Sequence, residues 1–89
     1  NPMVVNQSNH LAVKLLRETD SDIKTRVHWV YRRALQRDPT KEELNRAIGL
    51  VEDVHNELGS GILSTETETK AWATLCQALL ASNEFRYID

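Results

Sequence analysis

Hydrophobic residues recur every three to four positions over most of the 89-residue chain, which is the spacing of amphipathic helices. Four such stretches are predicted, over about 2–18, 23–36, 41–58 and 65–83. Clusters of residues that are typical of helix caps and turns separate them. The pattern therefore predicts an all-α fold, a small bundle of about four amphipathic helices on short connections.

The predicted core follows the apolar stripe of each helix. The stripe of the first helix is weak in the middle, because residues 7–10 are all polar, so this helix is expected to fray or to begin late. Beyond the fourth helix, the alternating Phe85, Tyr87 and Ile88 predict a short extended tail that packs back on the helices. The expected core positions are Val5, Leu11, Ala12, Leu15, Leu16, Ile23, Val27, Val30, Tyr31, Ala34, Leu35, Leu44, Ala47, Ile48, Val51, Val54, Leu58, Trp72, Leu75, Cys76 and Leu79.

Two helix starts carry strong local signals. Pro39 pushes the residue before it out of the α conformation, which ends the second helix. Thr40 and Glu43 then form a capping box, because the threonine side chain can accept from the Glu43 N–H while Glu43 reaches back. Thr65 and Glu68 predict a second capping box at the start of the fourth helix.

Composition indicates a single globular domain, so residues 1–89 are expected to form one helical unit. The chain is 40% hydrophobic and 27% charged, without an uncharged apolar run long enough for membrane insertion. Its formal net charge is -2, whereas most nucleic-acid-binding domains carry an excess of basic residues. Because it opens with Asn1 and Pro2 and no initiator methionine, we expect a piece of a longer protein or a processed product.

Side chains that support catalysis or metal binding are few and scattered. Cys76 is the only cysteine and lies within an apolar stripe, where a small buried residue is expected rather than a nucleophile. His10, His28 and His55 lie on three different predicted helices, without the spacing that places two ligands on one helical face. We therefore predict no catalytic residues, no cofactor, no metal site and no enzymatic activity.

Charge is distributed unevenly along the chain. Residues 22–46 carry seven basic and four acidic side chains, whereas residues 47–69 carry five acidic and no basic ones. Two helices on a short turn in the basic half fit a helix-turn-helix, which makes nucleic-acid binding one alternative. The second of these helices is acidic, however, and acidic groups facing phosphates weaken such binding. A polarised surface that docks on another domain or on a second copy is therefore favoured.

Trp29 is the clearest candidate for a binding residue. It lies off the apolar stripe of the second predicted helix, on the same side as Arg32 and Arg33. An exposed tryptophan beside two arginines is typical of anchor residues in protein interfaces. The alternative is that Trp29 packs on the first helix or on the C-terminal tail.

Two stretches of the chain carry recognisable patterns. The run from Ala71 to Asp89 holds an Ala-Trp pair, a leucine-rich helix and an Asn-Glu-Phe sequence followed by a tyrosine and a final aspartate. The run from Tyr31 to Thr40, with Glu43 and Leu44 after it, matches a Leu-x-Arg-x-Pro-Thr-x-x-Glu-Leu turn. With the opening Asn-Pro-Met-Val-Val, these stretches span nearly the whole chain, which resembles family 1553 of the planctomycete domains of unknown function.

The resemblance implies the C-terminal helical part of a larger exported protein, with cytochrome-c-like or other planctomycete domains upstream. That family has no established activity, so it supplies no catalytic residues. Within the matched stretches, Arg37 is expected to pair with Glu43 or Glu84, and Asn83 to end the fourth helix. The residues for which structural roles are expected are Arg37, Pro39, Thr40, Glu43, Trp72, Asn83, Glu84, Phe85 and Tyr87.

These observations predict a non-enzymatic structural or interaction module of a larger exported protein. Its expected partners are the upstream domains of that protein or a second copy of the chain. Two alternatives remain: a nucleic-acid-binding helical domain, which the acidic net charge disfavours, and an accessory domain that completes an upstream active site.

Overall fold

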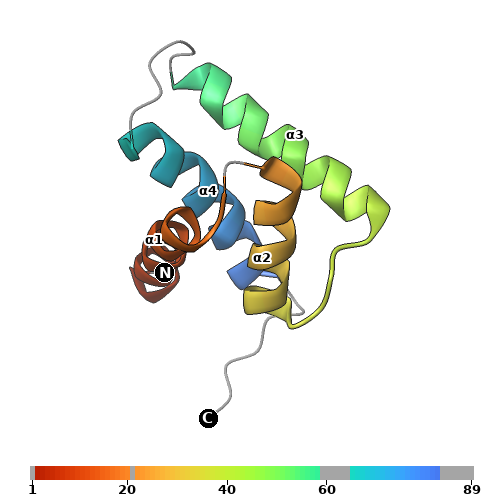
Figure 1. Cartoon of the computed structure of the whole chain (residues 1–89). Helices are drawn as coiled ribbons and strands as arrows, with labels where there is room; N and C mark the ends of the chain where they lie inside the picture. Colours follow the sequence, from red (N-terminus) through yellow and green to blue (C-terminus); the bar gives the residue numbers. More distant parts are fainter. Residues whose placement is uncertain (1, 21, 59–64, 83–89) are drawn as a thin grey trace.

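The computed structural model describes residues 2–20, 22–58 and 65–82 of the chain. Within these residues it contains four helices and no strand: α1 (Pro2–Glu18), α2 (Ile23–Leu35), α3 (Lys41–Glu57) and α4 (Thr65–Leu80) (Figure 1). The predicted all-α fold of four helices is confirmed. Among the helices described, none has both the length and the apolar character needed to cross a membrane.

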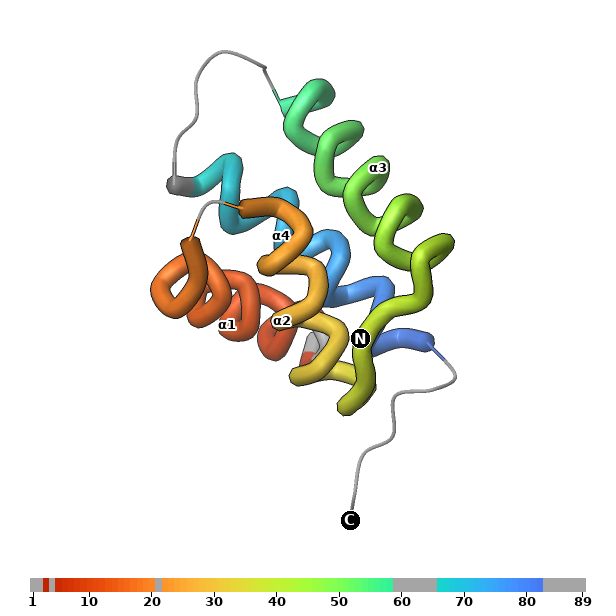
Figure 2. Tube along the Cα trace, turned by 45° about the vertical axis from the view of Figure 1, so that its right-hand side comes forward, coloured from red at the N-terminus to blue at the C-terminus, as the bar shows by residue number. Residues whose placement is uncertain are grey.

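Helix α4 is central to the fold, because most of the contacts between helices involve it, above all those with α1. Helix α2 crosses in front of it, between α1 and α3 (Figures 1 and 2). Helices α1 and α4 run antiparallel, since Asn6 near the start of α1 shares a groove with Leu80 at the end of α4. At the opposite end, the Arg26 side chain of α2 binds the carbonyl oxygen of Asp20 (2.8 Å) and lies 3.8 Å from the Glu68 carboxylate of α4.

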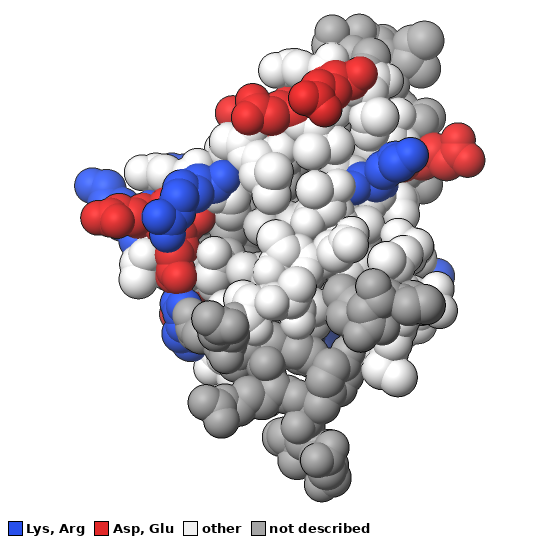
Figure 3. Space-filling model, turned by 180° about the vertical axis from the view of Figure 1, so that it is seen from behind, with Lys and Arg blue, Asp and Glu red and all other residues white. Residues whose placement is uncertain are grey.

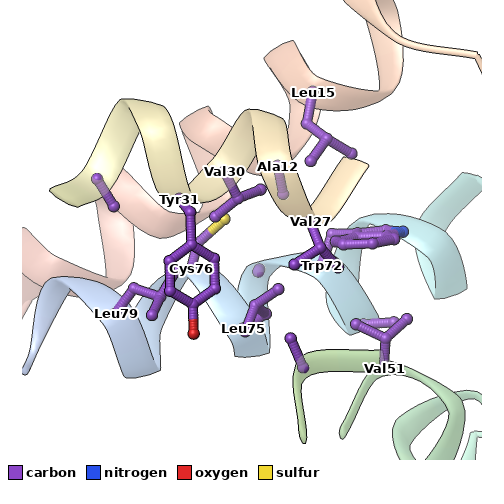
Figure 4. Packing of buried hydrophobic residues seen from close by; sticks show 14 of the residues in the cluster. Ala12, Leu15, Val27, Val30, Tyr31, Val51, Trp72, Leu75, Cys76 and Leu79 are labelled. Atoms are coloured by element: carbon purple, nitrogen blue, oxygen red, sulfur yellow. The ribbon is translucent and has the colours of Figure 1, made fainter. Parts of the chain in front are cut away.

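The core lies between α4 and the three helices packed on it, and Figure 4 shows its buried side chains converging from all four helices. Trp72 of α4 is its largest fully buried side chain, with 1% of its surface exposed. Burying a valine or leucine side chain completely stabilises a protein by about 1.5–3 kcal/mol. The fully buried aliphatic residues that contribute most in this way are Leu15, Val27, Val30 and Val51.

Helix α1 differs from the prediction in its first half. It begins at Pro2 and not late. Its polar middle is accommodated because Ser8 is buried on the same face as Ala12, four residues later. The expectation that Val5 lies in the core is wrong, since its side chain is 40% exposed. Among the α1 positions whose burial is described, the buried ones begin at Ser8, so Val5 lies one turn before the part of the helix that packs in the core.

The turn between α2 and α3 forms by local hydrogen bonds. Helix α2 ends at Leu35, and Gln36 takes the left-handed conformation (φ 61°) while its N–H donates to the Arg32 carbonyl oxygen. Thr40 caps α3: its side-chain oxygen accepts from the Glu43 N–H (3.1 Å), and the Glu43 carboxylate accepts from the Thr40 N–H (2.8 Å). The predicted capping box is therefore confirmed.

The ends of the last two helices fall at other places than expected. Leu58, predicted in the core, caps the C-terminus of α3 and is 40% exposed, because it lies beyond the last helical turn. Helix α4 ends at Leu80 and not at Asn83, and the Ser82 hydroxyl closes its last turn by donating to the Leu79 carbonyl oxygen (2.8 Å). The predicted tail positions, Asn83, Glu84, Phe85, Tyr87 and Ile88, lie outside the described residues.

At the start of α4, the Glu68 side chain contacts α3. The Glu68 carboxylate lies 3.0 Å from Nε2 of His55, in the last turn of α3. The Thr65 side chain, its predicted capping partner, lies outside the described part of the chain. This contact joins the two ends of the connection between α3 and α4.

Candidate interaction surface on α2

Trp29 lies at the edge of the core and not fully outside it. Its ring is half-buried and packs against the buried cluster, which corrects the picture of a wholly exposed anchor. The Arg33 guanidinium lies 4.8 Å from the centre of the indole ring, within the range of a cation–π contact. The structure therefore brings Trp29 and Arg33 together, one helical turn apart on α2.

A shallow groove of about 420 Å³ runs along this side of α2. Among the described residues, its lining includes no acidic side chain. We call it the basic groove, and its described lining is Lys24, Thr25, His28, Trp29, Arg32 and Arg33. Three cations and a histidine around a partly exposed indole can bind a carboxylate or phosphate next to a flat apolar group.

Asp38, in the turn after α2, contacts two residues that line the basic groove. Its carboxylate accepts from Arg32 Nε at 2.6 Å and lies 3.4 Å from His28 Nδ1. The hydrogen bond from Arg32, followed by that from His28, lowers the pKa of Asp38 below its usual range. The same contact raises the pKa of Arg32. All three side chains are open to solvent, so water and salt weaken these pairs.

Glu18, at the end of α1, contacts Arg33, a third residue that lines the basic groove. Its carboxylate lies 3.5 Å from the Arg33 guanidinium and 4.0 Å from the Lys14 ammonium. Arg33 therefore lies between an indole ring and a carboxylate, which fixes a long side chain that would otherwise be free to rotate. Both groove arginines are thus oriented by acids from other elements, in pairs exposed enough to exchange with a partner's carboxylate.

The predicted structural residues of the α2–α3 turn hold Asp38 in place. Arg37 forms a two-pronged ion pair with Glu43, with nitrogen–oxygen distances of 2.8 and 2.9 Å, and lies 5.7 Å from the centre of the Tyr31 ring. The pairing of Arg37 with Glu43 is confirmed. The hydrogen bond from Arg37, and then that from the Thr40 backbone, lowers the pKa of Glu43 to about 2.

The other chemistry-bearing side chains lie apart from this groove. Burial raises the pKa of the Cys76 thiol to about 12, so the thiolate that a nucleophile requires is absent near neutral pH. His10, His28 and His55 face three different surroundings: a groove beside α1, Asp38, and Glu68. Within the described residues no three metal-binding side chains form a cluster.

Charge also distinguishes the faces of the molecule. Helix α4 carries no charged residue after Lys70, and Figure 3 shows a broad uncharged area on the face opposite to the view of Figure 1. The outer side of α3 carries Glu42, Glu52, Asp53 and Glu57, all exposed. In a helix-turn-helix these acids would lie on the helix that enters the groove of DNA, where phosphates repel them.

Sequence reasoning identified Trp29, Arg32 and Arg33 but missed Asp38 and Glu18 as the residues that orient them. Comparison with protein-family models, with curated proteins and with solved structures gave no match for this chain. The resemblance to family 1553, and the exported parent protein that it implies, therefore stay predictions.

Proposed function

We propose that this chain is a non-enzymatic interaction module, the C-terminal part of a larger exported protein, which docks on an acidic surface of the upstream domains. The observation that carries this proposal is the basic groove, in which Trp29 lies under Arg33 and beside Arg32. Tryptophan and arginine are the residue types enriched among the side chains that dominate binding energy at protein interfaces.

The arrangement of charge supports an acidic partner. Residues 2–35, which form α1 and α2, carry six basic and three acidic side chains, whereas residues 41–80 carry three and seven. An acidic surface approaching the molecule is attracted to the α1–α2 side and repelled by α3, so charge selects the orientation before contact. Desolvating Trp29 against that surface then supplies binding energy that salt does not screen.

The proposal is tested by supplying the upstream domains of the parent protein as a separate polypeptide and measuring their binding to this chain by calorimetry. We expect Trp29→Ala and Arg32→Gln each to weaken binding about tenfold, the usual size of a hot-spot substitution. Raising salt from about 50 to about 300 mM is expected to weaken wild-type binding, because the groove carries exposed charge.

Arg46→Gln is the matched control, because Arg46 is an exposed arginine on α3 outside the basic groove. It should leave the affinity unchanged. If Trp29→Ala and Arg32→Gln bind as the wild type does, the basic groove is not the docking surface. Analytical ultracentrifugation of the chain alone tests self-association through the same groove, which the two variants would then also abolish.

The two alternatives have their own measurements. A nucleic-acid-binding domain would retain a duplex of about 20 base pairs at low salt and lose it steeply as salt rises; our proposal expects no retention. An accessory domain would be needed for the activity of the parent protein, so deletion of residues 1–89 would abolish that activity, whereas a docking module would alter assembly first.

A further inference from the structure

A second groove adjoins the basic groove at the junction of three helices. It has a volume of about 380 Å³ and is lined by α1, by Arg33 of α2 and by Leu80 at the end of α4. Leu11 and Leu80 give it an apolar base, and Asn6, Gln7 and His10 form its polar rim. We call it the apolar groove. Its volume lies in the range of pockets that enclose small ligands or single large side chains.

Arg33 is the one described residue that lines both grooves. Its guanidinium lies over the Trp29 ring on one side, and its exposed ion pair with Glu18 leaves it able to accept a different carboxylate. A segment that crosses Arg33 therefore meets cations on the side of the basic groove and a leucine-lined recess on the other side. The cations favour an acidic segment, and the recess favours an apolar side chain.

We infer that the apolar groove receives an apolar side chain of an acidic partner segment, with a neighbouring carboxylate of that segment on Arg33. This inference rests on the proposed function and narrows its partner to acidic segments that carry a large apolar residue. The basic groove supplies orientation through charge. The apolar groove supplies selectivity, because an acidic segment without the apolar side chain covers less of the apolar surface that Leu11 and Leu80 present in the groove.

The test uses three capped pentapeptides and amide NMR titration of the full chain. The first is Asp-Asp-Phe-Asp-Asp, the second has alanine in place of phenylalanine, and the third has lysine in place of every aspartate. We expect the first to shift the signals of Leu11, Arg33 and Leu80 and to bind about tenfold more tightly than the second, as burial of part of a phenylalanine ring predicts. The third should not bind.

Asn6→Trp places a large side chain at the exposed rim of the apolar groove, where it can cover Leu11 and Leu80 without removing any core side chain. It should remove the preference for phenylalanine over alanine without lowering the unfolding midpoint. Asn45→Trp, on the exposed side of α3, is the matched control and should keep that preference. Arg32→Gln should weaken both acidic peptides by the same factor, because Arg32 lines the basic groove only.

Equal binding of the phenylalanine and alanine peptides overturns the inference about the apolar groove. If Arg32→Gln still weakens the binding of both peptides, the proposed function stands without that inference. Loss of Arg32 dependence for the upstream domains overturns the proposed function itself. Two further results would also overturn the inference. One is a dimer that Asn6→Trp dissociates, which would make a second copy the occupant. The other is NMR contacts from Leu11 or Leu80 to Phe85 in the free chain, which would make the occupant the chain's own C-terminal segment.

Discussion

The ion pair between Arg37 and Glu43 is expected to make stability depend on pH in a defined window. Glu43→Gln removes the charge on the carboxylate but keeps an oxygen that can accept from the Thr40 N–H, so the capping box is retained. The variant therefore removes the ionised carboxylate, whose largest interaction is the pair with Arg37 at 2.8 and 2.9 Å and whose second is the hydrogen bond from the Thr40 N–H.

The magnitude follows from the pKa. Lowering the pKa of Glu43 from 4.5 to about 2 corresponds to about 3 kcal/mol for a fully shielded group, at about 1.36 kcal/mol per unit. The side chain of Glu43 is 19% exposed and that of Arg37 34%, so solvent screening reduces the expected contribution to about 1–2 kcal/mol. Because the folded pKa is the lower one, this stability is complete above about pH 4.5 and is lost as pH falls toward 2.

Urea unfolding followed by circular dichroism gives the free energy of unfolding at about pH 7, 4 and 3. We expect Glu43→Gln to be about 1–2 kcal/mol less stable than the wild type at pH 7, with the difference shrinking between pH 4 and 3. Glu42→Gln, an exposed neighbour in the same helical turn, controls for the charge at the start of α3. A difference that stays constant from pH 7 to 3 would refute the assignment of this stability to the ionised pair.

Three further predictions test the fold. Leu15→Ala is expected to cost about 2–5 kcal/mol in urea unfolding, because it leaves a cavity where the side chain is fully buried; the exposed Leu58→Ala should cost less than about 0.5 kcal/mol. Thr40→Ala should cost about 1 kcal/mol through loss of the α3 cap, and a cost near zero would contradict the hydrogen bond to the Glu43 N–H. Cys76 should react with a thiol reagent only in denaturant, since burial raises its pKa to about 12; rapid labelling of the native chain would show that this part of α4 opens.

Helix positions and the α2–α3 turn could be predicted from the sequence because their determinants are local. The capping box needs only Thr40 and Glu43 three residues apart, and the core stripe of α2 needs only its own periodicity. The pairing of Arg37 with Glu43 spans six residues of one turn. In each case the interacting groups belong to one element or to adjacent ones. Spacing alone decides the capping box and the stripe, whereas for Arg37 the sequence left Glu84 open beside Glu43.

Several failures of prediction depend on how the elements pack on one another. Val5 continues the stripe of α1, but the buried part of that helix begins at Ser8, and the periodicity of α1 does not show how far along it the other helices pack. Ser8 is polar but buried, because it lies on the face of α1 that also carries the buried Ala12 and Leu15. Asp38 reads as a turn residue in sequence. Its role in orienting Arg32 and His28 appears only once the turn folds back on α2.

The acids that orient the groove arginines also explain how the same surface can be selective. Left unpaired, Arg32 and Arg33 would attract any anion, including nucleic acid and free phosphate. Asp38 and Glu18 satisfy them in the free chain, at distances of 2.6 and 3.5 Å. A partner must then replace an existing ion pair, which yields little net energy from charge alone in an exposed pair. Binding becomes tighter when the partner also covers apolar surface, at Trp29 and at the leucines of the apolar groove. An Asp38→Asn variant should therefore bind acidic peptides more tightly but discriminate less between phenylalanine and alanine, and the peptide titrations measure both quantities; unchanged affinity would show that Asp38 does not restrain the groove.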